Sequence, residues 1–562
     1  MTVGQIIAEI MKRERITTIP MYAVTNMSEV TAAIDIRPII TRQERVACAM
    51  NDAQGRQSSG DDVKVFSTQA GPGVENAFGA IAQSYKDGAP LVYILIGPAA
   101  GAASVYPNFN PTLNFQHVTK SVESVTTPAM IVPALLRAFT LARNGRPGPT
   151  MIEVRDVFNQ EHPTIKTVAE LEYEPTKRTL MAADSKQIDA AADLLLKARM
   201  PLIYAGQGVH YAKAWPELRQ VAELLEAPVC TSMEGKSAFP ETHPLSCGSG
   251  GPTMTRSVAE HVRDSDVVFG VGVSFGTGFS IVWPTQGKEF IHLTVDERDL
   301  NKVVPSRYPM LCDAKLGLAE LYQALSARLK GKPRGLAKEV AARIQAQNGA
   351  WLQEWMPYLT SNAKPFSPYR VIYDLLQTVD VANTIITHDA GSPRNEIVPF
   401  WKPVTPLSYT GWGRELQLGH SLGLTMGAKL AHPEKLCMNY WGEAALGMTG
   451  IDLETCARCK IPIMSILSNN GAMKTEIAAM KLSHEKYHTC DITGNYADFA
   501  RALGCYAERV SEPDQIVHAI KNGIAATQKG QPVLLEFMTT QEVLYSTNGA
   551  GPGTSKPTGG DD

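Results

Sequence analysis

The chain has 562 residues, enough for about three or four domains. Apolar residues make up 44% and charged residues 19% of the sequence, a composition typical of a globular protein. The 53 basic and 56 acidic side chains give a net charge of −3. This balance argues against a nucleic-acid-binding protein, which would carry a clear excess of Lys and Arg, and gives no support for binding to an anionic membrane.

Two further features concern the cellular compartment. No apolar stretch approaches the ~20 residues that a membrane span requires, and the first residues lack the apolar core of a signal peptide. The nine cysteines are spread over a long chain, whereas a disulfide scaffold is short and rich in cysteine. We therefore predict a cytoplasmic protein with reduced, buried thiols and no membrane contact.

Three segments of the chain alternate apolar runs with helical patterns, which is typical of α/β domains with parallel sheets. We expect domains at residues 1–158, 184–330 and 368–545, and a mobile Gly/Pro-rich tail at 546–562. The clearest expected strands are residues 63–67, 91–96, 201–205, 267–271, 436–440 and 462–467.

The most informative polar residues follow two successive strands of the third segment. Glu443 comes after the strand at 436–440, and Asn470 comes after the strand at 462–467. Parallel neighbours would bring the two side chains together at the carboxyl edge of the sheet. A carboxylate, an amide oxygen and a backbone carbonyl suit Mg²⁺, which commonly also takes phosphate oxygens. The small residues Gly442, Ala444 and Ala445 would let a phosphate approach the backbone. The residues alone thus indicate a Mg²⁺–diphosphate site, and two ordinary polar loop ends remain the alternative.

The order of strand, Gly-acid, helix, strand and Asn-Asn resembles the cofactor signature of thiamine-diphosphate enzymes. Further matches occur in the same order along nearly the whole chain. They are the segments at residues 42–47, 70–76, 145–149, 235–245 and 418–428. The segment at 235–245 is similar to the acetolactate-synthase-like branch. The resemblance implies three flavodoxin-like or Rossmann-like domains: a pyrimidine-binding, a central and a diphosphate-binding domain.

The resemblance also implies the cofactors and the residues that hold them. Glu443, Asn470 and the carbonyl of Ala472 would bind Mg²⁺, and Leu418 would be the apolar wedge that keeps thiamine diphosphate bent. The other residues expected near the cofactor are Gly71, Pro72, Asn76, Gly391, Ser392, Gly442, Ala444 and Ala445. The pyrimidine and diphosphate domains of this family meet across a subunit interface, so a homodimer or homotetramer is implied.

Glu44 is the expected catalytic residue. The resemblance implies that its carboxyl binds N1′ of the aminopyrimidine and so promotes loss of the proton from C2 of the thiazolium. A solvated helix residue is the alternative reading of Glu44.

The sequence also departs from the family. The Asp that usually binds the metal is replaced here by Glu443, which is one methylene longer. The Arg-Phe-Asp-x-Arg-like run of flavin-containing synthases is replaced at residues 273–278. We therefore expect no bound FAD. The predicted activity is decarboxylation or carboligation of 2-oxo acids, as in acetolactate-synthase-like enzymes. A 2-hydroxyacyl-CoA lyase or oxalyl-CoA decarboxylase is the alternative, and a non-catalytic cofactor-binding relative is a third.

Weaker candidates have simpler explanations. The Gly-Gln-Gly at 206–208 and the CxxC at Cys456 and Cys459 are expected to be structural. Four histidines could handle protons in a cleft, although each is more simply a hydrogen-bonded side chain. They are His210, His420, His484 and His488.

Overall fold

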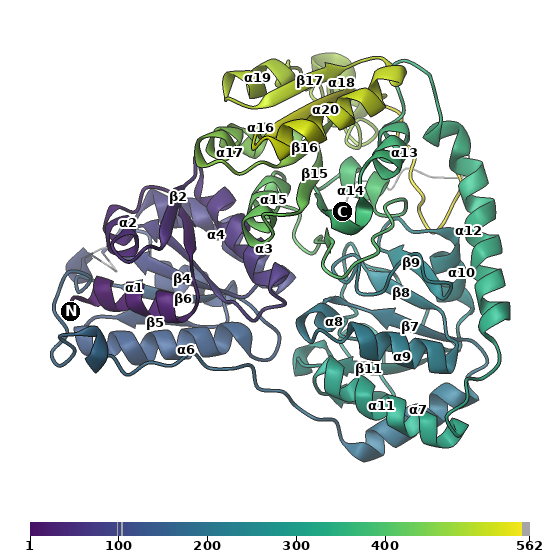
Figure 1. The fold of residues 1–562 in the computed structure, drawn as a ribbon, viewed down its shortest axis with the longest axis horizontal. Helices are drawn as coiled ribbons and strands as arrows, with labels where there is room; N and C mark the ends of the chain where they lie inside the picture. Colours follow the sequence, from purple (N-terminus) through teal and green to yellow (C-terminus); the bar gives the residue numbers. More distant parts are fainter. Residues whose placement is uncertain (98, 103–104, 553–562) are drawn as a thin grey trace.

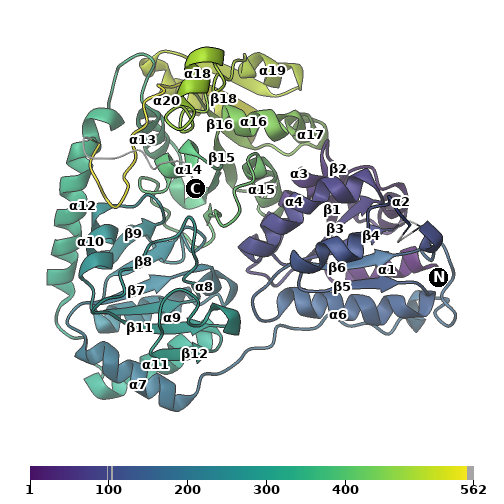
Figure 2. The ribbon, with the colours of Figure 1, turned by 180° about the vertical axis from the view of Figure 1, so that it is seen from behind.

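The computed structural model describes residues 1–97, 99–102 and 105–552. It contains three six-stranded sheets whose strand pairs are all parallel, which confirms the predicted three-domain α/β fold. Figure 1 shows the N-terminal domain in purple and blue, the central domain in teal and the C-terminal domain in green and yellow, and Figure 2 shows the reverse side. None of the described helices combines the length and apolarity needed to span a membrane.

The N-terminal sheet has the strand order β2-β1-β3-β4-β6-β5. Its strands are β1 (Thr18–Met21), β2 (Arg37–Ile40), β3 (Lys64–Gln69), β4 (Leu91–Ile96), β5 (Val122–Val125) and β6 (Thr150–Val154). The helices are α1 (Val3–Arg13), α2 (Thr25–Ala32), α3 (Glu44–Gln57), α4 (Pro72–Asp87), α5 (Pro111–Asn114) and α6 (Ile131–Arg143). Separate apolar clusters join α1 and α6 to the sheet and α3 and α4 to the sheet, so both faces are covered.

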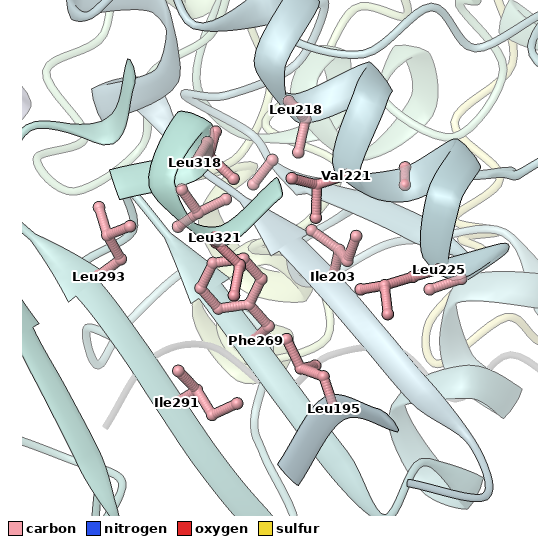
Figure 3. Close-up of a cluster of buried hydrophobic side chains, with 14 of the residues drawn as sticks. Leu195, Ile203, Leu218, Val221, Leu225, Phe269, Ile291, Leu293, Leu318 and Leu321 are labelled. Atoms are coloured by element: carbon pink, nitrogen blue, oxygen red, sulfur yellow. The ribbon is translucent and has the colours of Figure 1, made fainter. Parts of the chain in front are cut away.

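The central sheet has the order β12-β11-β10-β7-β8-β9. Its strands are β7 (Pro201–Ala205), β8 (Val229–Ser232), β9 (Ser246–Gly250), β10 (Val267–Val271), β11 (Glu289–Thr294) and β12 (Tyr308–Leu311). The helices are α7 (Ser185–Lys197), α8 (Gln207–Tyr211), α9 (Trp215–Leu225), α10 (Arg256–Asp264) and α11 (Ala314–Leu329). Figure 3 shows the largest apolar cluster, in which Leu218 and Leu321 pack over Ile203 and Phe269 of the sheet.

The C-terminal sheet has the order β14-β13-β15-β16-β18-β17. Its strands are β13 (Thr384–His388), β14 (Tyr409–Thr410), β15 (Leu436–Gly442), β16 (Met464–Asn469), β17 (Tyr506–Val510) and β18 (Val533–Met538). The helices are α13 (Pro368–Thr378), α14 (Ser392–Ile397), α15 (His420–Ala431), α16 (Glu443–Thr449), α17 (Leu453–Cys459), α18 (Lys481–Tyr487), α19 (Tyr496–Ala502) and α20 (Ile516–Gln528).

Two segments join the central and C-terminal domains. Helix α12 (Ala337–Leu359) runs along the edge of both (Figure 1), and its Trp351 ring stacks on Phe400 at 4.8 Å between centroids. Residues 546–552, predicted as the start of a mobile tail, are packed: Ser546 is fully buried, receives a hydrogen bond from the Trp351 indole and donates one to Met254 O. Composition predicted mobility here because it does not reveal these distant partners. The rest of the predicted tail, 553–562, lies outside the described residues.

The N-terminal and C-terminal domains meet where α3 lies against α15, at the centre of both ribbon views (Figures 1 and 2). Two glycines of α15 make this approach possible. A Cβ on Gly423 would lie 2.7 Å from Val46 O, and a Cβ on Gly427 would overlap Met50 O. These contacts are with backbone atoms, which cannot move aside as a flexible side chain does.

We predict that Gly427→Ala lowers the melting temperature, because relieving the overlap should cost about 1–3 kcal/mol of helix packing. The matched control is Gly349→Ala in the exposed middle of α12, where a Cβ meets no atom within 4 Å. That change should stabilise the helix by about 0.5–1 kcal/mol. Thermal unfolding of both variants and of the wild-type protein checks the prediction. A melting temperature of Gly427→Ala equal to that of the wild-type protein would contradict the close α3–α15 packing.

Candidate active site

The predicted Glu443–Asn470 pair is present at the carboxyl edge of the C-terminal sheet. Strand β15 ends at Gly442 and pairs in parallel with β16, so that Gly442 lies opposite Ser468. Helix α16 then begins at Glu443, whose Oε1 accepts the backbone N–H groups of Asn470 and Gly471, both at 2.5 Å. The side-chain amide of Asn470 lies 3.4 Å from Oε2. The register of two parallel strands therefore brings these residues together.

Both polar side chains of this pair are in surroundings that disfavour them: a buried carboxylate and an amide oxygen that lacks a hydrogen bond from the described residues. Glu443 is 2% exposed, and burial raises the pKa of its carboxyl to about 7, against the opposing effect of the backbone N–H groups and of nearby Lys474. Within the described part of the chain, the buried Oδ1 of Asn470 has no hydrogen-bond partner. An unsatisfied buried acceptor costs about 1–3 kcal/mol, and a cation would satisfy it. The carboxylate and the amide oxygen are thus ligands of the kind that Mg²⁺ prefers, and the expected third ligand, the Ala472 carbonyl, follows two positions after Asn470.

The predicted diphosphate residues line the same edge. Gly391 has a φ of 78°, a conformation that favours glycine, and a Cβ placed on it would meet no atom of the described residues within 4 Å. A Cβ on Gly442 would meet Pro393 at 3.7 Å. The Ser392 hydroxyl lies 2.6 Å from the Tyr545 hydroxyl. These two glycines leave room for a phosphate to approach the backbone.

The two alanines after Glu443 differ from each other. Ala444 is partly exposed, whereas Ala445 is 1% exposed and packs in an apolar cluster. The structure therefore leaves Ala444 as the more accessible of the two.

Leu418, the predicted wedge, lies in a turn that is fixed from two sides. Its carbonyl accepts a hydrogen bond from the Arg45 guanidinium at 3.2 Å. The next turn is held by Asp389, a fully buried carboxylate that accepts the N–H groups of Gly419 at 3.0 Å and Ser421 at 3.1 Å. Sequence reasoning missed Asp389, although an acid directly after strand β13 is a signal that could have pointed to it.

Glu44 begins α3 and is 5% exposed. The Asn76 amide, on α4, lies 3.5 Å from its Oε2, and a Cβ on Gly73 would lie 3.4 Å from its Oε1. Burial raises the pKa of the Glu44 carboxyl. Gly71, with a φ of 71°, and Pro72 form the turn into α4, so the structure brings the predicted Gly-Pro-Gly turn to Glu44.

The Glu44 segment also touches the C-terminal domain. The Gln43 amide donates to Met448 O at 3.0 Å, in the helix that starts at Glu443, and the Arg42 N–H donates to Asp452 at 2.7 Å. These contacts lie within one chain, and a further meeting of the two domains across a subunit interface is expected from the family resemblance. The oligomeric arrangement itself stays a prediction.

The weaker candidates lie in packed or hydrogen-bonded positions that a structural role explains. Gly208 donates its N–H to Gly272 O at 2.9 Å, so the Gly-Gln-Gly turn serves close packing. Cys456 and Cys459 are free and buried. Burial lowers the pKa of His210 to about 4, and its ring is held by Lys236 O and the Trp215 indole.

Of the other three candidate histidines, one is buried between two helices and two lie near α18. His420 is buried at the α3–α15 contact, 3.9 Å from Asp52, and burial lowers its pKa to about 4. His484 and His488 flank Asp491 near α18. A neutral, enclosed His420 is poorly placed to exchange protons with solvent.

Sequence comparisons agree with this geometry. Models of the N-terminal TPP-binding, central and C-terminal TPP-binding domains of thiamine pyrophosphate enzymes match residues 1–122, 188–321 and 389–537. The chain belongs to the thiamine pyrophosphate enzyme family.

Its relatives are similar over nearly their full length. A probable acetolactate synthase large subunit of Methanocaldococcus jannaschii is 28% identical over 90% of this chain and 85% of the relative. A sulfoacetaldehyde acetyltransferase of Castellaniella defragrans is 29% identical over 91% and 88%. The acetolactate synthase isozyme 3 large subunit of Escherichia coli is 25% identical over 89% and 87%.

We predict that Asn470→Ala abolishes stabilisation by Mg²⁺ with thiamine diphosphate and lowers the melting temperature of the ligand-free protein only slightly. Among the described residues, its Oδ1 has no partner and its amide nitrogen makes only the long 3.4 Å contact with Glu443. The control is Asn469→Ala. Asn469 donates to Glu536 at 2.7 Å and accepts from Gly471 at 3.0 Å, so its loss should destabilise the ligand-free protein by about 1–3 kcal/mol. Thermal shifts with and without ligands separate the two, and full Mg²⁺ stabilisation of Asn470→Ala would contradict the site.

Proposed function

We propose that this protein uses thiamine diphosphate and Mg²⁺ to cleave or form a carbon–carbon bond next to a carbonyl group of a 2-oxo acid. The observation that carries the proposal is the buried Glu443–Asn470 pair, with its unsatisfied amide oxygen, beside the segment that bears Glu44. Carbon–carbon bond chemistry on thiamine diphosphate needs two contributions from the protein. One is a site that binds Mg²⁺ and the diphosphate, and the other is a buried acid for the pyrimidine ring.

The residues present fit the cofactor and the metal. Glu443, Asn470 and the carbonyl of Ala472 would hold Mg²⁺, and the glycine turns at Gly391 and Gly442 would admit the diphosphate. Bound thiamine diphosphate supplies an electron sink for bond cleavage beside a carbonyl. The remaining residues proposed to line the cofactor are Gly71, Pro72, Asn76, Ser392, Leu418, Ala444 and Ala445.

Glu44 would hold and exchange a proton at the pyrimidine ring. Its burial favours the protonated carboxyl, which can donate a hydrogen bond to a ring nitrogen. The Asn76 amide orients Oε2, which leaves Oε1 for the ring. Leu418 is held in place by Arg45, the neighbour of Glu44, so the acid and the wedge are positioned together.

The substrate class is proposed from the relatives together with the site. Acetolactate synthases and a sulfoacetaldehyde acetyltransferase match this chain over most of its length. We therefore favour decarboxylation or carboligation of 2-oxo acids over a 2-hydroxyacyl-CoA lyase or oxalyl-CoA decarboxylase. Incubation with pyruvate and, separately, with a 2-hydroxyacyl-CoA tests this choice, and turnover of the CoA ester alone would overturn it.

The assembly and surroundings are part of the proposal. We expect a homodimer or homotetramer in the cytoplasm, without bound FAD and without nucleic-acid or membrane partners. Sedimentation should give at least a dimer, and a monomer at working concentration would contradict this expectation. Calorimetric titration with thiamine diphosphate and Mg²⁺ tests for a non-catalytic relative that binds the cofactor weakly, because absence of heat would favour that relative over the enzyme.

We predict that Glu44→Gln leaves cofactor binding within a few-fold of the wild-type value but slows exchange of the C2 proton by at least ~10²-fold, since general acid–base groups typically contribute about 10²–10⁴-fold. Proton exchange into deuterated solvent, followed by NMR, measures this. The control is Glu29→Gln, which changes an exposed acid of α2 in the same domain. Wild-type exchange in Glu44→Gln would remove Glu44 from the mechanism.

A further inference from the structure

A buried ion pair involves the loop between β16 and α18, residues 470–480, which bears Asn470 and is called the metal loop here. The Lys474 ammonium contacts Glu396 Oε1 at 2.7 Å, and the two side chains are 2% and 1% exposed. Lys474 comes four positions after Asn470, and Glu396 lies in α14, four positions after Ser392. The pair therefore connects the metal side of the site to its diphosphate side.

The same two residues reach two more parts of the site. The Tyr440 hydroxyl, on β15 three positions before Glu443, donates to Glu396 Oε2 at 3.2 Å. The Lys474 ammonium also donates to Glu542 O at 3.3 Å, in the segment that follows β18. The pair thus joins strand β15, helix α14, the metal loop and the C-terminal segment.

The C-terminal segment makes parallel contacts with both sides of the site. The Gln541 amide donates to Asn470 O at 3.0 Å, and the Tyr545 hydroxyl contacts Ser392. Gln541 and Tyr545 lie on either side of Glu542, whose carbonyl accepts from Lys474. The segment 541–545 therefore contacts Asn470, the ion pair and Ser392.

Stability alone is a poor explanation for such a pair. Removing two charges from water costs several kcal/mol per ion, and replacing a buried ion pair with apolar residues is often neutral or stabilising. The metal loop, by contrast, needs an external support. After Asn470 it turns through Gly471 at a φ of 75°, and no helix longer than a turn begins until α18 at Lys481.

We propose that Lys474 and Glu396 are positioning residues whose ion pair holds the metal loop against α14, so that Glu443, Asn470 and Ala472 are arranged for Mg²⁺ before it binds. This inference rests on the proposed function. Mg²⁺ requires near-ideal octahedral geometry, so a loop that is free to shift loses metal affinity. Neither residue is required to touch the metal or the cofactor.

The test is calorimetric titration of Mg²⁺ into the full-length protein with excess thiamine diphosphate. Lys474→Met should weaken Mg²⁺ binding by about 10–100-fold, the usual effect of losing a residue that supports a metal ligand. Lys474→Arg, which keeps the charge, should recover part of that affinity. The matched control is Lys236→Met, which breaks another buried Lys–Glu pair, with Glu241 at 2.5 Å, in the central domain. It should lower stability without weakening Mg²⁺ binding.

A neutral pair keeps the proposal falsifiable if Lys474→Met does not fold. The double variant Lys474→Met/Glu396→Gln leaves no uncompensated charge, so it should recover stability yet keep the weak Mg²⁺ affinity. Wild-type affinity in the double variant, or in Lys474→Met, would overturn the positioning role. Absence of any Mg²⁺ and cofactor binding in the wild-type protein would instead overturn the proposed function, and this inference with it.

Discussion

The parallel pairing of β15 with β16 is the constraint on which the rest of the site depends. It places Glu443, at the end of one strand, within reach of the backbone N–H groups that follow the next strand. Burial then makes this carboxylate costly to keep charged, and none of the described residues gives the Asn470 amide oxygen a hydrogen-bond partner. A bound divalent cation would relieve both penalties. We therefore propose that the free energy lost here prepares the loop to bind metal.

A second constraint brings the other half of the site to this loop. Glycines at 423 and 427 let α15 approach the backbone of α3, and α3 begins at Glu44. With the helices this close, Arg45 donates a hydrogen bond to Leu418 O, and Gln43, beside Glu44, donates one to Met448 O of α16. The glycine contacts are therefore as important for the geometry of the site as the polar residues that would touch the cofactor.

The sequence predicts the fold and the centre of the site because both follow from local patterns. Apolar runs mark the strands to within one or two residues; the run at 462–467, for example, is β16 at Met464–Asn469. Residues that follow neighbouring strands, such as Glu443 and Asn470, can be placed together from strand order alone. The three-domain α/β fold could therefore be predicted without knowledge of long-range contacts.

The supporting residues could not be predicted in the same way. Lys474 and Glu396 lie 78 positions apart and look like ordinary surface charges in the sequence, since only the tertiary fold buries them. The same holds for residues 546–552, whose composition favours mobility but whose Ser546 binds an indole 195 positions away. Composition and spacing carry no information on such partners.

A crystal structure of the protein with thiamine diphosphate and Mg²⁺ tests the central claim most directly. The account predicts the ion between Glu443 and Asn470, with the pyrimidine ring within hydrogen-bond distance of a Glu44 carboxyl from the same chain or from a neighbouring copy. A cofactor bound with its pyrimidine remote from every Glu44, or a metal held by other residues, would contradict it.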